Sequence, residues 1–402
     1  MKRISSNKRL TSKKVSYFRN MDPVLLLATV GLLLFGLYMI YSASNIAAKR
    51  EYGLPPYHFF LKHIKLAVAG IVASIIVIKL NPKTYGFLSK VYLLGVFILL
   101  AMTEIHGIAT NGSTSWINIG PIQIQPSEFA KSALILYFGC ILGSKTKWKD
   151  ILSPLLWVII PAGAIFLLVA GQPDLGSAMI IGIITMIVVY FIPFDSPKWF
   201  KIAKWVIALC IAGGIILMPT ILESENFISG MLTAEQRERV LEYKDPCNKY
   251  QDSGYQVCHG YIAINSGGLT GQGIGNSTQK FLYLPEAYTD FIFPIITEEL
   301  GVVTAGIILL VYLILLIRIL MIAANATDLR GSIIALGTFA FILAHIVVNL
   351  GGVLALMPLT GVPLPFLSYG GSFLINLLVM LAFTQRVAID TRIAKQKQIG
   401  KR

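Results

Sequence analysis

The chain has 402 residues, of which 55% are hydrophobic and 13% charged, whereas an average soluble domain has roughly 25% charged residues. A water-soluble fold could not bury that much apolar surface, so the composition excludes a soluble enzyme and predicts an integral membrane protein. The net charge of +14 does not indicate nucleic-acid binding, because Lys and Arg gather in the two tails and in alternate loops. This is the positive-inside pattern, which predicts that both termini face the cytoplasm and that the basic residues contact anionic membrane lipids.

Apolar runs recur along the whole chain, and about 20 such residues in a helix cross a bilayer. Only helices and closed barrels satisfy backbone groups in lipid, and these runs are too long for barrel strands. The predicted fold class is therefore an all-α integral membrane protein with about ten transmembrane helices. The third run is the weakest because Lys90 interrupts it. The runs are Val24–Ser42, Ile64–Ile78, Tyr85–Met102, Ser127–Leu142, Ile151–Ala170, Gly176–Phe194, Val206–Leu222, Leu300–Ile317, Ser332–Met357 and Phe366–Phe383.

The expected organisation is a basic cytoplasmic tail at 1–21, a ten-helix membrane domain at 22–387 and a second basic cytoplasmic tail at 388–402. Three polar segments are predicted outside: Glu104–Lys131, a large extracellular loop at 223–299 between helices seven and eight, and Pro358–Gly371. The prolines and glycines of the third forbid a regular helix, and irregular backbone at membrane depth is tolerated only in protein or beside a cavity. Together the segments predict an outward-facing polar cavity.

The large loop contains a charged, helix-like stretch, Glu235–Lys244, and an amphipathic stretch, Tyr255–Ile264, that could lie on the membrane surface. Cys247 and Cys258 share this loop. A disulfide between them and two free thiols are equally compatible with the spacing. The cysteines and histidines show no metal-ligand spacing.

Ionisable residues at the ends of membrane helices are costly and are therefore functional candidates. Glu128 and Lys131 are three residues apart, so they pair on one helix face. The pair either locks the fourth helix to its neighbours or faces the cavity, where Lys131 would meet an anionic ligand. Asp174 either caps the helix that follows it or belongs to the site.

Asp290 lies at the mouth of the eighth apolar helix, where burial would make it a credible general base, although a helix N-cap is an equally good interpretation. Glu298, beside Glu299, lies two turns further on. It either takes part in the site or stabilises the packing of the helix. The glycines of 271–275 follow no strand, which excludes a nucleotide-binding loop, but backbone amides near Lys280 could hold a pyrophosphate. Aromatic residues such as Trp116 and Tyr369 are ligand contacts or interface anchors.

Read together, these segments resemble the SEDS family of bacterial peptidoglycan polymerases over nearly the whole chain. The blocks that carry the resemblance are Tyr41-Ser-Ala-Ser44, Gln125-Pro-Ser-Glu128-Phe-Ala-Lys131, Gln172-Pro-Asp-Leu-Gly176, Gly271-Gln-Gly-Ile-Gly-Asn-Ser-Thr-Gln-Lys280, Leu284-Pro-Glu-Ala-Tyr-Thr-Asp290, Glu298-Glu-Leu-Gly301, Asn349-Leu-Gly351 and Leu367-Ser-Tyr-Gly-Gly371. The segment from Gly275 to Ala287 resembles the FtsW branch more than the RodA branch, with a sporulation relative as the alternative.

The resemblance implies a ten-helix fold in the bacterial cytoplasmic membrane and glycosyl transfer between two lipid II molecules, which extends a glycan strand. Asp290 takes the position of the family's essential aspartate. Undecaprenyl pyrophosphate leaves, with Lys131 and Lys280 as the nearest cations and a divalent cation, Mg or Mn, as the expected cofactor. The implied substrate-binding residues are Glu128, Lys131, Asp174, Lys280, Glu298, Trp116, Ser368 and Tyr369.

The resemblance also implies protein partners: a class B penicillin-binding protein that cross-links the product, and other division or elongation proteins. The sequence departs from the family at Ser115, where an Arg is usual before Trp116, and at His345, where Gln is common. The alternatives to a polymerase are a lipid II flippase and a non-catalytic scaffold. A transporter predicts charges at mid-membrane and symmetric halves, whereas these ionisable residues gather at the outer ends and the sequence has no internal repeat.

Overall fold

The structure is a computed structural model that describes residues 17–110, 113–120, 122–144, 152–191, 245–247 and 252–399. The predicted seventh span, Val206–Leu222, and the charged stretch Glu235–Lys244 lie outside these residues. Each of the other nine predicted spans overlaps a described helix, and six of these are long and apolar enough to cross a membrane. Those six are α2 (Pro23–Arg50), α3 (His58–Lys79), α4 (Tyr85–His106, after the 3-10 turn Pro82–Thr84), α12 (Ile292–Asn325), α13 (Leu329–Val353) and α14 (Gly371–Ile399).

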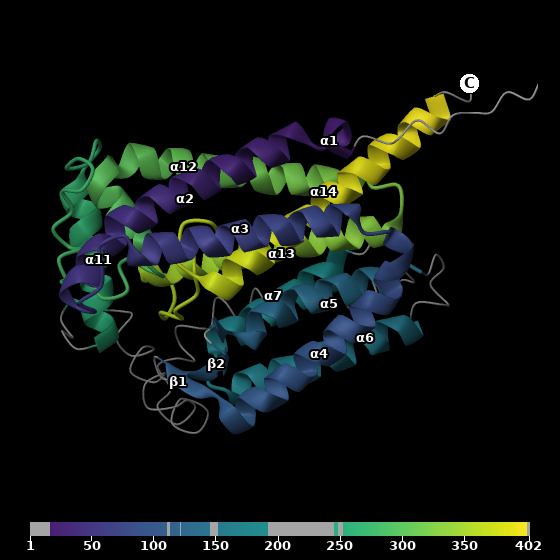
Figure 1. Ribbon diagram of the computed structural model, residues 1–402, viewed down its shortest axis with the longest axis horizontal. Coiled ribbons are helices and arrows are strands. Elements are labelled where there is room, and N and C mark those ends of the chain that lie inside the picture. The colour runs from purple at the N-terminus through teal and green to yellow at the C-terminus, as the bar shows by residue number, and fades with distance from the viewer. Residues whose placement is uncertain are drawn as a thin grey trace, which may run out of the picture.

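The remaining spans correspond to α5 (Pro126–Leu142), α6 (Leu152–Gly171) and α7 (Leu175–Phe191). Helices α13 and α14 are the most enclosed, with 78% and 89% of their most apolar windows buried, against 28–39% for α2, α3, α4 and α12. The short helix α1 (Tyr17–Asn20) and the C-terminal end of α14 lie at one end of the bundle, and α11 (Asp252–Gly267) lies at the opposite end (Figure 1). We call these the Asp22 end and the Asp290 end.

Local sequence explains where several helices begin. Pro23 and Pro126 occupy the first turns of α2 and α5, where a missing N–H costs nothing. Asp22 and Asp328 cap α2 and α13, and their side chains accept hydrogen bonds from Leu25 N at 3.1 Å and Gly331 N at 3.3 Å. These short polar caps define the residues at which the apolar helices begin.

The all-α expectation is wrong in one segment. Residues 108–124 form a small antiparallel sheet in the order β1 (Ile108–Thr110), β2 (Ser113–Ile119) and β3 (Ile122–Ile124). The sequence of β2 is short and contains Ser and Asn, which favours a loop interpretation, but its Thr, Trp and Ile residues are types that favour strands. Strand β2 packs against α4 and α5.

Helix α12 is longer than the predicted span Leu300–Ile317 and is broken within it. Gly301 has φ 82° and ψ 166°, so the chain leaves and re-enters the helix there. The amides of Gln272 and Gly273 donate to the carbonyl oxygens of Glu298 at 2.9 Å and Glu299 at 3.0 Å. A Cβ on Gly271 would lie 2.3 Å from Glu299 O, so glycine is required for this approach. The glycine-rich loop therefore completes the hydrogen bonding that the break interrupts.

The amphipathic stretch of the large loop forms α11, which packs against α12. Cys247 and Cys258 form a disulfide, which decides between the two alternatives that the sequence left open. The bond ties the segment before α11 to that helix and so limits the conformations of the loop.

Helix α14 begins five residues later than predicted and extends through most of the expected C-terminal tail, to Ile399. It cannot begin at Phe366 because this residue has φ 67° and follows Pro363 and Pro365. At the other end, the Lys and Gln residues of the tail are good helix formers and continue the helix.

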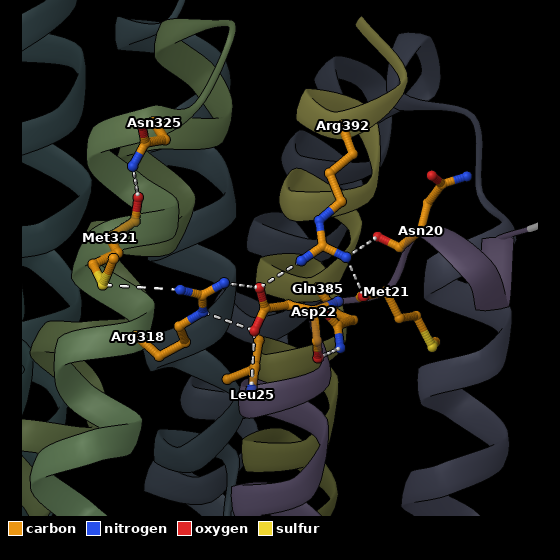
Figure 2. Close-up of polar contacts among 9 residues, drawn as sticks. All are labelled: Asn20, Met21, Asp22, Leu25, Arg318, Met321, Asn325, Gln385 and Arg392. Carbon is orange, nitrogen blue, oxygen red and sulfur yellow. Dashed lines mark hydrogen bonds and ion pairs between the residues drawn. The ribbon is translucent and has the colours of Figure 1, made fainter. Parts of the chain in front are cut away.

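One carboxylate joins three helices at the Asp22 end (Figure 2). Asp22 Oδ1 and Oδ2 accept from Arg318 Nε at 2.8 Å and Nη2 at 2.5 Å, and Oδ2 also accepts from Arg392 Nη2 at 3.1 Å. Burial raises the pKa of Asp22, but the hydrogen bonds and charges of the two arginines outweigh this effect and hold it below its ordinary value of 3.8. The carboxylate therefore stays ionised and fixes α2 to α12 and α14.

Helix α2 contacts the irregular segment before α14 at Gly36, where a Cβ would lie 2.0 Å from Phe366 O. We expect Gly36→Ala to separate the two segments and cost about 1–3 kcal/mol, the usual range for overpacking. Gly31→Ala, on the same helix with nothing within 4 Å, is the matched control and should be neutral or slightly stabilising. Thermal unfolding of the purified protein in detergent measures both, and equal midpoints would contradict the close approach.

The depressed pKa of Asp22 predicts a pH dependence. Its contribution to stability is fully present above about pH 3.8 and is lost as the pH falls further through the folded-state pKa. Asp22→Asn should therefore lower the unfolding midpoint most at neutral pH, and the difference from the wild type should shrink below about pH 3.8. Asp390→Asn, which removes a half-exposed partner of Arg386, should have a smaller effect. A pH-independent difference for Asp22→Asn would contradict the assignment.

Candidate functional site

The predicted site residues lie at or near the Asp290 end of the bundle. Asp290 is 7% exposed and directly precedes Phe291, which is the N-cap residue of α12 and makes no side-chain capping bond. The N-cap interpretation of Asp290 is therefore wrong. Thr289 Oγ1 donates to Asp290 Oδ1 at 3.1 Å and lies 2.6 Å from Glu286 Oε2, so one hydroxyl stands between two carboxylates.

The backbone on both sides of Asp290 is held by residues distant in sequence. Asn349 Nδ2, on α13, donates to Asp290 O and to Val362 O, each at 2.8 Å. Glu286 and Phe366 have φ 54° and 67°, a left-handed conformation that is costly for residues with side chains and is often found at functional sites. The segment that carries the carboxylate is thus fixed by α13 and by the irregular segment before α14.

Aromatic rings pack beside Asp290. Tyr369 N donates to Tyr288 O at 2.9 Å, and the Tyr288 ring lies 4.9 Å from Phe59 and 5.8 Å from Tyr369 between centroids. Burial and a hydrogen bond with Tyr52 raise the pKa of Tyr288, so its hydroxyl stays protonated and can donate. Tyr369, a predicted contact, therefore belongs to the same group of residues as Asp290.

A cavity of about 250 Å³ opens between the C-terminal end of α2 and residues 280–288. Its walls include Glu51 and Tyr52, which directly follow α2, Lys280 from the glycine-rich segment, and Glu286 and Tyr288 from the segment that leads to Asp290. Two carboxylates, one ammonium group and two tyrosines thus surround a space that a polar ligand group can enter.

Lys280 and Glu299 form a buried ion pair with an Nζ–Oε1 distance of 2.7 Å. Ser42 Oγ, from α2, lies 2.7 and 2.8 Å from the Glu299 carboxylate oxygens and 3.4 Å from Lys280 Nζ. Lys280 is only 3% exposed, so the predicted phosphate-binding cation already has a carboxylate partner. Ser42 belongs to the Tyr41–Ser44 motif, but nothing in its neighbourhood in the sequence indicates Glu299 as a partner.

Glu298 is fully buried and organises the glycine-rich segment. Its carboxylate accepts from Thr278 N at 3.0 Å, from Thr278 Oγ1 at 2.8 Å and from the hydroxyl of Ser277. Glu298 therefore holds the segment before Lys280 against α12. The amides of Gln272 and Gly273 are likewise bound to α12 carbonyls, so this part of the loop does not offer them to a pyrophosphate.

Glu128 and Lys131 form the ion pair that their spacing predicts, at 2.7 Å, and both side chains are buried. Lys131 Nζ also lies 3.3 Å from His345 Nε2, so the residue that departs from the family contacts this lysine. Asp174 caps α7 by accepting from Ser177 N at 3.0 Å and also accepts from Gln125 Nε2 at 3.0 Å. Asp174 thus caps α7, whereas the Glu128–Lys131 pair fits both of its interpretations. The contacts of Lys131 reach α13 and those of Asp174 reach the start of α5.

Trp116 is half-buried on β2, after the buried Ser115, and Ser368 Oγ accepts from Leu364 N at 2.8 Å within the turn before Tyr369. Sequence reasoning missed the roles of Ser42, Asn349 and Tyr52. The first two belong to motifs that were recognised, and Tyr52 carried no signal. Among the described residues, no three His, Cys, Asp or Glu side chains converge on a metal-binding position.

Residues 23–393 match the family described as Cell cycle protein, which groups FtsW, RodA and SpoVE. The chain belongs to this family. It is 36% identical to Stage V sporulation protein E of Bacillus subtilis over 95% of this chain and 100% of that protein, and 34% identical to the probable peptidoglycan glycosyltransferase FtsW of the same organism over 94% and 93%. The two identities are similar, so the FtsW branch stays a prediction.

Solved structures have the same fold. A chain of a peptidoglycan synthase complex that coordinates polymerization and crosslinking aligns with a TM-score of 0.68 at 25% identity, over 92% of this chain and 98% of that one. The rod shape determining protein RodA of Thermus thermophilus aligns with a TM-score of 0.62 at 23% identity, over 92% and 97%. With six helices of membrane-spanning length and apolarity, this FtsW, RodA and SpoVE family member is a multi-pass membrane protein.

The Lys280–Glu299 pair predicts a specific pattern of stability. Lys280→Met leaves the Glu299 carboxylate buried without a cation, which typically costs about 3–5 kcal/mol. Adding Glu299→Gln removes that charge and should recover most of the loss, whereas Lys49→Met, at an exposed position on α2, should change little. Unfolding midpoints of the purified variants test this, and equal losses in the single and double variants would show that the pair does not act as a unit.

Proposed function

We propose that this protein is a peptidoglycan glycosyltransferase that polymerises lipid II into glycan strands at the outer face of the bacterial cytoplasmic membrane. The single observation that carries the proposal is the position of Asp290 at the start of an apolar helix. Thr289 donates to its carboxylate, Asn349 holds its main-chain carbonyl, and the segment that leads to it lines a cavity as far as Tyr288. Family members with known names support the activity, since several are called probable peptidoglycan glycosyltransferase FtsW. The role in septal wall synthesis belongs to the proposal.

Asp290 acts as the general base. It takes the proton from the acceptor sugar hydroxyl, whose oxygen then attacks the anomeric carbon of the donor lipid II. The bond between that carbon and the pyrophosphate oxygen breaks, undecaprenyl pyrophosphate leaves with the bonding electrons, and the anomeric configuration inverts. A positioned carboxylate suits this step because a fixed base contributes about 10²- to 10⁴-fold to such a proton transfer.

The departing pyrophosphate requires positive charge or N–H donors. Lys280 borders the cavity, but its pairing with Glu299 makes it a partly neutralised cation, and Lys131 is engaged with Glu128. Lys280 and Lys131 are proposed to stabilise the pyrophosphate electrostatically while each stays bound to its glutamate partner, and not as free ammonium groups. A divalent cation, Mg or Mn, would add charge at the pyrophosphate oxygens.

A class B penicillin-binding protein is the proposed partner. The fold is shared with a chain of a synthase complex that couples polymerization to crosslinking, which supports such an arrangement. Other division or elongation proteins would direct the pair to its place in the cell.

The test compares wild type with Asp290→Asn, each purified with its class B penicillin-binding partner and incubated with labelled lipid II. Polymer should form with the wild type, and its initial rate should fall at least about 100-fold with Asp290→Asn at an unchanged unfolding midpoint. Glu104→Gln, which alters an exposed carboxylate at the same end of the bundle, should polymerise normally.

Equal polymer from wild type and Asp290→Asn would reject the role of Asp290 and favour a scaffold. Movement of lipid II across vesicles, without polymer from any variant, would instead favour a flippase.

A further inference from the structure

A second cavity of about 250 Å³ lies at the Asp22 end, between the start of α2, the C-terminal part of α12 and the last turns of α14. Three cationic side chains line it, Arg318, Arg392 and Lys395, with one carboxylate, Asp22. Asp22 is bound by both arginines and neutralises a single charge. The cavity therefore keeps an excess of positive charge, which favours an anionic occupant.

Thr391 also lines this cavity and is 7% exposed. Its Oγ1 is buried and has no hydrogen-bond partner among the described residues. Buried hydroxyl groups nearly always have a partner, and a ligand oxygen in the cavity would supply one. This observation is independent of the charges around the cavity.

Arg392 Nη1 donates to the carbonyl oxygens of Met21 and Asn20, whereas Arg318 keeps donor capacity that Asp22 does not use (Figure 2). Arg318 directs Nε and Nη2 to Asp22, whereas the contact of Nη1 is the sulfur of Met321 at 3.9 Å, a weak acceptor. Lys395 is exposed at the rim. A phosphate group suits such a set, because guanidinium and ammonium groups form charge-assisted hydrogen bonds with its oxygens.

An apolar stripe continues from the cavity along α12. Met321, which lines the cavity, is followed at spacings of four, three and four residues by Ile317, Ile314 and Leu310, all on one face of the helix. These four side chains are 47%, 48%, 43% and 53% exposed. An anion that enters the cavity from the membrane could therefore lay an acyl chain on this face.

We propose that the cavity at the Asp22 end binds the phosphate group of an anionic phospholipid, with an acyl chain along Met321, Ile317 and Ile314. The phosphate oxygens accept from Arg318, Lys395 and the Thr391 hydroxyl. The ligand then bridges α12 and α14 at the end of the bundle away from Asp290. This site does not depend on the reaction proposed for Asp290.

The test uses the full chain, purified in detergent, and native mass spectrometry with phosphatidylglycerol or phosphatidylcholine as the probe. We expect one phosphatidylglycerol to bind in preference to phosphatidylcholine. Thr391→Val should weaken its binding roughly threefold to tenfold, the effect of one hydrogen bond to a charged group. This substitution changes no charge, so it separates a built site from general attraction to a basic surface.

Lys395→Gln should weaken binding to a similar extent, whereas Lys397→Gln, two residues further along α14 and outside the cavity, should not. Both lysines are exposed, so neither change threatens folding. Unaltered binding by Thr391→Val and Lys395→Gln would overturn the proposal. Displacement of the lipid by inorganic phosphate alone at equal concentration would also overturn it, because the acyl chain would then contribute nothing.

Discussion

The break in α12 at Gly301 is the constraint on which the Asp290 end depends. A continuous helix would bond its own carbonyl and amide groups and leave the glycine-rich loop without partners. Instead the loop donates to Glu298 O and Glu299 O, and Val302 N donates to Gly268 O. The main chains approach so closely that a Cβ on Gly301 would lie 2.2 Å from Leu269 O. Both this close approach and the positive φ of Gly301 therefore require glycine at this position.

Two buried glutamates next to this break, Glu298 and Glu299, hold the segment that leads to Asp290 in place. Glu298 fixes the residues that precede Lys280, and Glu299 joins Lys280 to α2 through Ser42. The segment from Lys280 to Asp290 is thus anchored at its start by these carboxylates and at its end by Asn349. A carboxylate on a segment held at both ends needs little reorganisation when it accepts a proton, which is the advantage of a preorganised site.

The ion pairs at the two ends of the bundle differ in how deeply they are buried. At the Asp290 end the pairs Glu128–Lys131 and Lys280–Glu299 are almost completely buried, so they are stable only as pairs. At the Asp22 end Arg318 and Arg392 are 26% and 37% exposed around a buried carboxylate. Ion pairs are thus enclosed in the interior at one end, whereas at the other end the cationic partners stay partly exposed.

The sequence by itself determined the helices, because apolar length, proline at the first turn and an aspartate cap are local properties. It also located Asp290 before an apolar helix and paired Glu128 with Lys131, three residues away. It did not predict the strands at 108–124, which are too short for a clear alternation. Only the tertiary structure decided that Ser42 bonds Glu299, 257 positions later, and that Asn349 holds Asp290. Such partners come into contact because helices distant in sequence pack together, and the local sequence around either residue does not predict that contact.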